Sequence, residues 1–144
     1  MPPKIINRYH FSVEWGGTRT EFLEVSGLDM NIDIISVRDG SFKLDSEQKA
    51  PGLLKYSDVT LKRAIVKGDN DFFNWMKTKS FGNVERRDII IKLLDEQFNP
   101  LIIWRLKNSF PSKYIGPVLI SHDSQVATET LVITHEGMLI ESIK

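Results

Sequence analysis

The side chains that could do chemistry are few in this sequence, and they are widely spaced. The 144 residues include three histidines, His10, His122 and His135, and no cysteine. The histidines lack the i, i+4 spacing of a helical zinc site. A chain without cysteine has no thiolate metal ligand, no disulfide and no thiol nucleophile. We therefore predict solvated or hydrogen-bonded histidines and no metal site.

One acidic segment matches the opening of a calcium-binding loop and then departs from it. Asp29, Asn31 and Asp33 have the spacing of the first EF-hand ligands, but Ile34 stands where that loop requires glycine and Gly40 where it requires a glutamate. Phosphate-cradle, dinucleotide and nucleophile-elbow motifs are absent from the sequence as well. The sequence therefore predicts no catalytic residue, no cofactor and no enzymatic activity, and a hydrolase is the least favoured reading.

The residues around these positions predict a mainly β fold. Polar and apolar residues alternate along much of the chain, as expected for strands with one buried face. Pro111 lacks an N–H and restricts the residue before it, so residues 108–111 are predicted to stop a strand. We expect strands at 7–15, 21–28, 30–37, 59–66, 88–94 and 100–106, and a further strand from 128 that Gly137 ends.

A short helix is predicted between the strands. Phe72, Trp75 and Met76 fall on one face at i, i+3 and i+4, which indicates a helix over residues 72–77 packed against the core. Asp69 or Asn70 is placed to cap its free N–H groups.

Two further patterns bear on how the chain associates. Residues 38–52 are polar, lack periodicity and end in Pro-Gly, so we predict a projecting arm. Residues 89–94 and 101–104 are nearly continuous apolar runs, which are typical of strands covered on both faces.

Composition limits the class of protein. Lys plus Arg and Asp plus Glu both number 19, giving a net charge of zero. This balance argues against a dedicated nucleic-acid binder and lowers the repulsion that opposes self-association. No signal peptide and no apolar stretch of the ~20 residues needed to cross a bilayer is visible. We expect one domain over 1–144 that stays soluble in the cytoplasm where it is made, with no membrane insertion by the chain itself.

Taken in order, several segments together resemble the tail-tube protein family of contractile phages and contractile injection systems. The haemolysin-coregulated protein of type VI secretion is a structural cousin of that family. The resemblance spans nearly the whole chain. The segments that carry it are RYHFSVEW (8–15), FLEVSGL (22–28), APGLLKYSDVTLKR (50–63), DFFNW (71–75), DEQFNPLIIWRLKNSFPSKYIGP (95–117) and ETLVITHEGM (129–138).

The resemblance implies an antiparallel β-sandwich or barrel with one short flanking α-helix and an extended arm loop at about 30–52. Six subunits would join their sheets into a ring, and the rings would stack into a hollow tube that carries DNA or protein cargo. The partners implied are further copies of the chain, the sheath protein, baseplate and spike proteins and the tube cap. The tube would belong to a phage tail or an injection particle, and no cofactor is implied.

The working residues are then interface residues. The inter-subunit sheet contact is predicted at the apolar runs, and the ring-stacking contact is predicted in the arm. The predicted sheet residues are Ile89, Ile91, Leu93, Leu101 and Ile103, and the predicted stacking residues are Asp39, Ser41, Phe42, Lys43, Leu44, Asp45, Glu47 and Gln48.

Two alternatives remain at this stage. The chain could be a tube-initiating adaptor near the baseplate, from the same family. It could also be a small monomeric β-barrel with an apolar ligand pocket.

Overall fold

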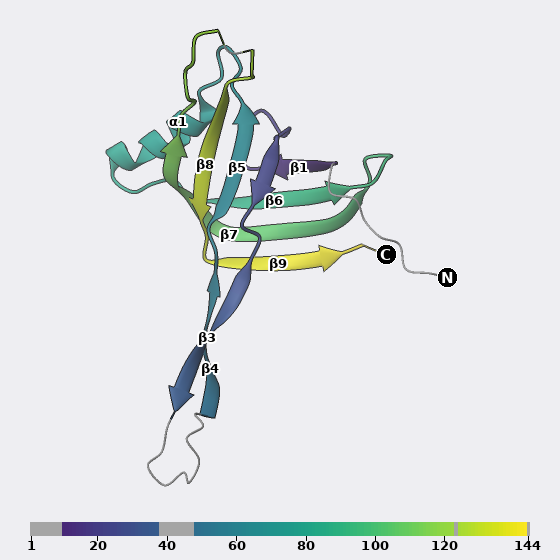
Figure 1. The fold of residues 1–144 in the computed structure, drawn as a ribbon, viewed down its shortest axis with the longest axis vertical. Coiled ribbons are helices and arrows are strands. Elements are labelled where there is room, and N and C mark those ends of the chain that lie inside the picture. The colour runs from purple at the N-terminus through teal and green to yellow at the C-terminus, as the bar shows by residue number, and fades with distance from the viewer. Residues whose placement is uncertain (1–9, 38–47, 123, 144) are drawn as a thin grey trace.

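The chain folds into a mainly β structure (Figure 1), seen in a computed structural model that describes residues 10–37, 48–122 and 124–143. Every strand pairing is antiparallel, and the described residues contain one α-helix, so the predicted fold class is confirmed. The elements are β1 Phe11–Glu14, β2 Glu24–Ser26, β3 Met30–Val37, β4 Gln48–Tyr56, β5 Val59–Ala64, α1 Asp71–Lys77, the 3-10 helix η1 Thr78–Phe81, β6 Arg87–Leu94, β7 Pro100–Ile115, β8 Thr128–Thr134 and β9 Gly137–Ser142.

The long strand β7 joins two parts of one sheet. Its first half pairs with β6 and β9, and its second half pairs with β8, giving the order β1-β6-β7-β8-β5-β2 with β9 beside β7. The part made of β6, β9 and the start of β7 runs across the direction of β5 and β8 (Figure 1). We call β1, β6, β9 and the first half of β7 the four-stranded layer.

The prediction that residues 108–111 stop a strand is wrong. The strand continues and bends there: Asn108 has a φ of 50°, Pro111 pairs with Ile133, and the register shifts between Pro111 and Lys113. A proline costs a sheet one ladder hydrogen bond, and an irregular position at a bend tolerates that loss.

The core lies between the four-stranded layer, β5, β8 and α1. Trp15, Phe72 and Trp75 form an aromatic cluster, with 5.0 Å between the Trp15 and Phe72 rings. The indole N–H groups are satisfied, since Trp15 donates to the Arg19 carbonyl at 2.8 Å and Trp75 to the Glu85 carbonyl at 2.7 Å. The helical stripe predicted from the sequence is therefore core packing.

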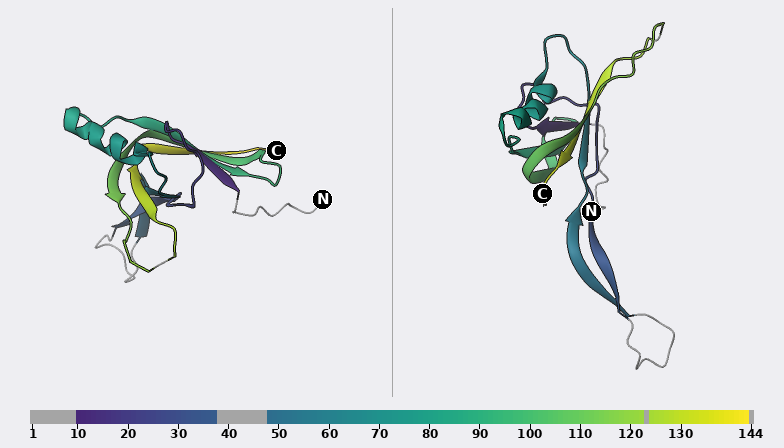
Figure 2. Two further views of the ribbon diagram at one scale, coloured as in Figure 1. Left: turned by 90° about the horizontal axis from the view of Figure 1, so that it is seen from above. Right: turned by 90° about the vertical axis from the view of Figure 1, so that its left-hand side faces the viewer.

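Strands β3 and β4 form a hairpin that projects from the rest of the subunit (Figures 1 and 2). We call this hairpin the arm. It has 8 and 9 residues in its strands, so it is about 30 Å long at the usual rise per residue. Residues 48–52, expected to be loop, are strand instead, and residues 38–47 lie outside the described residues.

The arm contains a β-bulge at Gly52. The register shifts between Ile32 and Ile34, because β4 contributes one extra residue there. A Cβ on Gly52 would lie 3.0 Å from the carbonyl oxygen of Asp33, so the bulge needs a residue without a side chain.

Candidate assembly surfaces

The polar residues that might have formed a reactive site are instead structural. His135 contacts the carbonyl oxygens of Ser57 at 3.1 Å and Gly137 at 3.2 Å, which fixes the base of the arm. Asp33 lies on an extended strand and pairs with Lys55 at 2.8 Å. An extended strand does not wrap around an ion as a calcium loop does. In the part of the chain that the structure describes, no group of three His, Cys, Asp or Glu residues is placed to hold a metal.

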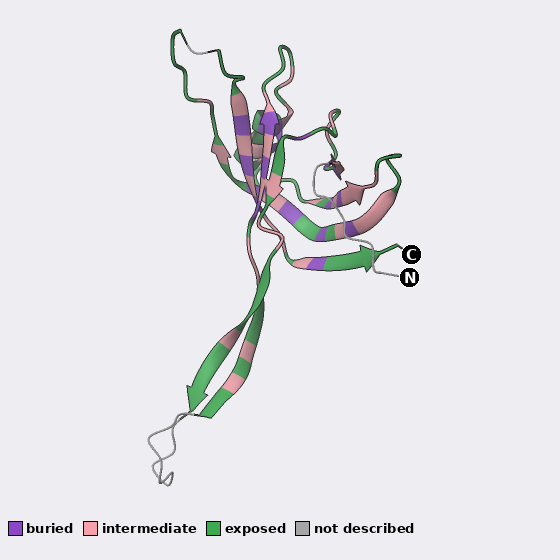
Figure 3. Cartoon of the chain, turned by 45° about the vertical axis from the view of Figure 1, so that its right-hand side comes forward, coloured by how far each residue is buried: buried purple, intermediate pink, exposed green. Residues whose placement is uncertain are grey.

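One side of the arm, which we call the arm face, is apolar along most of its length, whereas the other side mixes Asn31 and Asp33 with Ile35 and Val37. Met30, Ile32 and Ile34 alternate along β3 and so share a side, opposite Leu54 and Pro51 of β4. The chain itself leaves this side uncovered: Ile34 is 68% exposed and Ile32 is 54% exposed. Figure 3 shows the arm as mostly exposed, with a few residues of intermediate burial and none that is buried.

A second apolar surface lies at the far end of the molecule from the arm (Figures 1 and 2). It consists of residues 65–66, Ile115 at the end of β7 and the loop residues 116–122 and 124–127, which together we call the upper loops. Leu119 is 85% exposed and Val118 is 83% exposed, and part of this loop lines an open groove of about 450 Å³. Its other exposed apolar side chains are Ile65, Val66, Ile115, Ile120 and Val126.

A third surface is the free edge of the four-stranded layer, which we call the β9 edge. In the described part of the chain β9 pairs with β7 alone, so its other side is unpaired. Leu139, Ile140 and Ile143 are exposed there. An exposed edge strand with apolar side chains is a site where another strand or chain associates. On its core side, the layer also borders a groove of about 670 Å³, lined in part by Phe11, Leu23 and Trp104.

The predicted sheet-interface residues do not occupy one surface. Ile89 (0% exposed) and Ile91 (1%) are in the subunit's own core, and Ile103 (7%) is buried on the opposite face of the layer. Leu93 and Leu101 are half-buried. The subunit alone therefore buries the first three side chains. Whether the strands that carry them meet another subunit remains a prediction.

The predicted stacking residues fall mostly outside the described part of the chain. Gln48, exposed at the start of β4 and paired with Val37, is the one with a described position. The sequence reasoning missed the upper loops and the β9 edge. The available signal was the apolar run of Val118, Leu119 and Ile120, which has no strand alternation. The residues outside the description are Asp39, Ser41, Phe42, Lys43, Leu44, Asp45 and Glu47.

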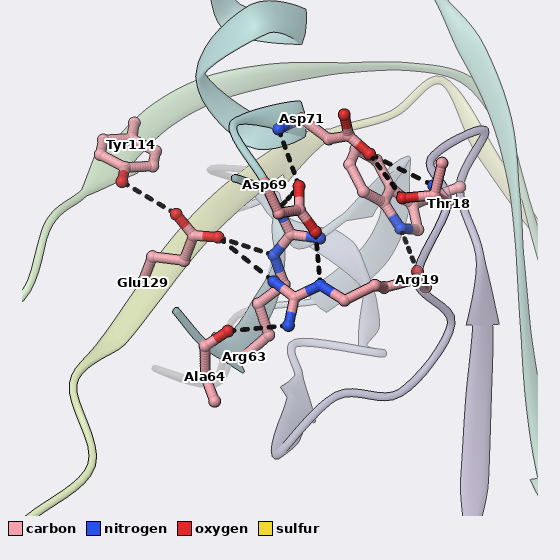
Figure 4. A network of polar contacts seen from close by, with 9 residues as sticks. Thr18, Arg19, Arg63, Ala64, Asp69, Asp71, Tyr114 and Glu129 are labelled. Atoms are coloured by element: carbon pink, nitrogen blue, oxygen red, sulfur yellow. Dashed lines mark hydrogen bonds and ion pairs between the residues drawn. The ribbon is translucent and has the colours of Figure 1, made fainter. Parts of the chain in front are cut away.

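A buried network of charges holds the stems of the upper loops (Figure 4). Arg63, which is fully buried, donates from Nε to Glu129 Oε1 at 2.7 Å and from Nη2 to Asp69 Oδ1 at 3.3 Å. Its guanidinium lies 3.8 Å from the centre of the Phe72 ring. The Tyr114 hydroxyl donates to the other oxygen of Glu129 at 3.0 Å. The end of β7, the start of β8 and the end of β5 are thus tied together.

Arg19 joins the same network from the loop after β1. Its Nε lies 2.5 Å from Asp69 Oδ2, and its Nη1 donates to the Ala64 carbonyl at 3.0 Å. Burial acts to raise the pKa of Asp69, but the hydrogen bonds from the Asp71 N–H and Arg19 and the positive charge of Arg63 outweigh it. The net pKa is below its ordinary value. Burial and the hydrogen bond to Glu129 raise the pKa of Tyr114, so its hydroxyl stays a donor.

The geometry defines a class of protein that works by association: a β subunit with an uncovered arm, an exposed loop cluster and a free sheet edge. Solved structures share this fold. A chain in the cryo-EM structure of the anti-feeding prophage cap matches with a TM-score of 0.88 and 27% identity, over 99% of this chain and 95% of that chain. A chain in the sheath–tube complex of the extracellular contractile injection system PVC, in its extended state, matches with a TM-score of 0.87 and 26% identity, over 96% and 93%.

More distant structures share the fold alone. Hcp1 from Flavobacterium johnsoniae matches with a TM-score of 0.61 and 19% identity, over 92% of this chain and 94% of that chain. Comparison with curated protein sequences gives no match.

The sequence matches the family described as T4-like virus tail tube protein gp19 over residues 7–139. The chain belongs to this family, and the resemblance stated from the sequence is confirmed. The family is a structural one, the tail tubes of contractile systems. No helix in the described ranges is long and apolar enough to cross a membrane.

Proposed function

We propose that this chain is the repeating subunit of the inner tube of a contractile tail or injection system, acting as a single tail-tube domain over 1–144 without catalytic activity. The observation that carries the proposal is a tail-tube fold whose arm, loops and sheet edge are left uncovered by the subunit itself. Six copies close into a ring and the rings stack into a hollow conduit for DNA or protein cargo. Assembly begins in the bacterial cytoplasm.

The ring closes through the four-stranded layer. This layer has β9 at one edge and β1 at the other, so β9 of one subunit can meet the β1 side of the next. Such a contact joins two different surfaces, and repeating it with a suitable rotation closes a ring. Closure also removes the exposed edge, which is otherwise a liability for a β protein.

The layer's outer face lines the lumen in this arrangement. Its other face packs on the core, and the rest of the subunit lies on that side, where a ring has the larger circumference. The lumen face carries two ion pairs, Glu14 with Lys92 at 3.0 Å and Arg105 with Glu141 at 3.3 Å. Paired charges of opposite sign give a surface with a weak net field, over which cargo of either sign can pass.

The likeness to chains in sheath–tube, cap and baseplate structures supports the other partners. We propose that the tube is surrounded by a sheath, begins at a baseplate with its spike and ends at a cap.

Negative-stain electron microscopy of the purified protein at low and high concentration tests the proposal. Six-fold rings and stacked hollow rods are expected. Monomers at every concentration, together with binding of apolar dyes, would favour the small ligand-binding barrel instead. Short stacks that form only with baseplate proteins would favour the tube-initiating adaptor.

A matched pair of variants tests the β9 edge. Ile143 N–H donates to Leu101 of β7 at 2.9 Å, so by alternation the Ile140 N–H faces the free side. Ile140→Pro removes that outward donor and spares the β7 ladder, whereas Ile140→Ala removes only side-chain atoms. We expect the proline variant to stay monomeric and the alanine variant to form rings. Rings from both variants would contradict closure through this edge.

A further inference from the structure

His135 joins two parts of the fold at the base of the arm. It follows β8 in the turn that leads to β9, and Figure 1 shows this turn beside the point where the arm leaves the subunit. Its Nε2 lies 3.1 Å from the carbonyl oxygen of Ser57, and its Nδ1 lies 3.2 Å from the carbonyl oxygen of Gly137. Ser57 directly follows β4, so one side chain links the arm to the start of β9.

Both ring nitrogens of His135 therefore face acceptors. A carbonyl oxygen cannot donate, so each contact is a hydrogen bond only where the ring nitrogen carries a proton. A neutral imidazole has one N–H group, whereas the imidazolium ion has two. The imidazolium can make both hydrogen bonds at once, but the neutral ring can make one and leaves the lone pair of its other nitrogen facing an oxygen.

The arm side of this contact includes both stems of the arm. The N–H of Ser57 donates to the Asp29 carbonyl, directly before β3, at 3.1 Å. Tyr56, the last residue of β4, packs against the His135 ring with 5.5 Å between the ring centroids. A hydrogen bond from His135 to Ser57 thus acts on the residue that joins the two stems of the arm to each other.

The ionisable side chains on the surrounding segments have partners of their own. Asp58, on the link to β5, accepts a hydrogen bond from Thr134 Oγ1 at 3.1 Å. Glu136 pairs with Arg86 at 2.8 Å, and its N–H donates to the carbonyl of Lys107 in β7. Among side-chain types, histidine is the one that ordinarily changes charge between about pH 5 and 8, so His135 is the group through which pH can act on this cluster.

We propose that His135 is a pH-sensitive clamp between the arm and the turn from β8 to β9. The imidazolium holds the carbonyl oxygens of Ser57 and Gly137 together. When the ring loses its proton, one of these two hydrogen bonds is lost, and the base of the arm is no longer held from both sides. The direction of the arm is then well defined at acid pH and less well defined at alkaline pH. The clamp acts within one subunit, so it stands or falls independently of the proposed tube.

NMR of the two acceptor carbonyls tests the clamp at its origin. The carbon-13 shifts of the Ser57 and Gly137 carbonyls are followed between about pH 5.5 and 8.5, together with the protonation of the His135 ring. We expect at least one of these carbonyl shifts to change with the same midpoint as the ring, because that carbonyl loses its donor. Carbonyl shifts that stay constant while the ring loses its proton would overturn the clamp.

Distances between two spin labels measure the consequence for the arm. The chain has no cysteine, so Leu53→Cys on the arm and Phe73→Cys on α1, both at exposed positions, allow one label on each. In monomeric protein, we expect the distance distribution to be about twofold wider or more at the higher pH, as a locally released segment samples more conformations.

Two matched variants assign this effect to one ring. His135→Gln does not titrate, so it should give the same width at both pH values. His122→Gln removes a histidine in the upper loops and should behave as the native chain does. Equal widths at both pH values in the native chain, or a pH dependence that persists in His135→Gln, would overturn the clamp. If His135→Gln does not fold, the NMR series on the native chain still decides, because it alters no side chain.

Discussion

Removing Glu129 should strongly destabilise the subunit. Glu129 is 5% exposed, and its carboxylate accepts a hydrogen bond from the guanidinium of Arg63, which is fully buried. Truncation to alanine leaves that positive charge with Asp69 alone, at 3.3 Å, and Arg63 Nη1 already has no hydrogen-bond partner in the described structure. Breaking a buried ion pair in this way costs about 3–5 kcal/mol.

Two milder variants separate the contributions of charge and hydrogen bonding to the stability lost in Glu129→Ala. Glu129→Gln keeps the shape and an acceptor oxygen but loses the charge, so it should cost less, on the order of 1–2 kcal/mol. Tyr114→Phe removes only the hydroxyl that donates to Glu129, and should cost about 1 kcal/mol. The loss of stability is therefore expected to be largest for Glu129→Ala, smaller for Glu129→Gln and smallest for Tyr114→Phe.

Thermal unfolding followed by circular dichroism measures this series. At about 2–4 °C per kcal/mol for a protein near this size, Glu129→Ala should lower Tm by about 10 °C and Tyr114→Phe by about 3 °C. The measurement should use conditions in which the protein is monomeric, because assembly would add its own stabilisation. A Tm loss under about 3 °C for Glu129→Ala would refute the reasoning.

Three further predictions concern the same subunit. Folding lowers the pKa of Asp69, so the ionised carboxylate stabilises the fold above its unfolded pKa, and this stabilisation is lost as the pH falls through the folded-state pKa. Asp69→Asn should therefore make Tm depend less on pH in the acid range, as measured by thermal unfolding over a pH series. Gly27→Ala places a Cβ 2.1 Å from the Asp58 carbonyl oxygen at a φ of +87°, and should lower the free energy of unfolding by about 2 kcal/mol or more. Gly68→Ala has a similar φ of +83° but open space around the Cβ, so it should cost only the backbone strain of about 1 kcal/mol. Urea unfolding measures both variants. Arg63→Met with Glu129→Leu replaces the ion pair by apolar side chains and should leave Tm unchanged or raise it.

Strands were predicted best from the sequence where one side of the strand faces the subunit's own core and the other side does not. In β8, Leu131 and Ile133 face the core and alternate with half-buried residues, so the period-2 pattern was clear. Glu129 follows the same alternation although it is charged, because Arg63 pairs with it. That pairing links residues 66 positions apart, and no local pattern encodes it.

Strands were missed where their neighbours are not in the subunit's core. In β9, Met138 packs in the core while Leu139 and Ile140 are exposed on opposite sides of the strand, so three apolar residues occur in a row without alternation. Residues 48–52 of the arm contain Pro51 and Gly52 and pack on no core at all, so they were taken for a loop. A strand that packs on no core of its own subunit has no buried side, and so its sequence shows no alternation.

The buried network and the assembly surfaces depend on each other in the proposed tube. A well-packed apolar core would hold β5, β7 and β8 together at least as well as an ion pair, so stability alone does not require Arg63 and Glu129. The planar guanidinium of Arg63 donates hydrogen bonds in fixed directions, and these orient the stems of the upper loops in a way that apolar packing does not. The variant with methionine and leucine at these positions separates the two roles, because it should keep Tm and yet form shorter tubes. Full-length tubes from that variant would show that the network serves the fold alone, and the orientation of the upper loops would then need another cause.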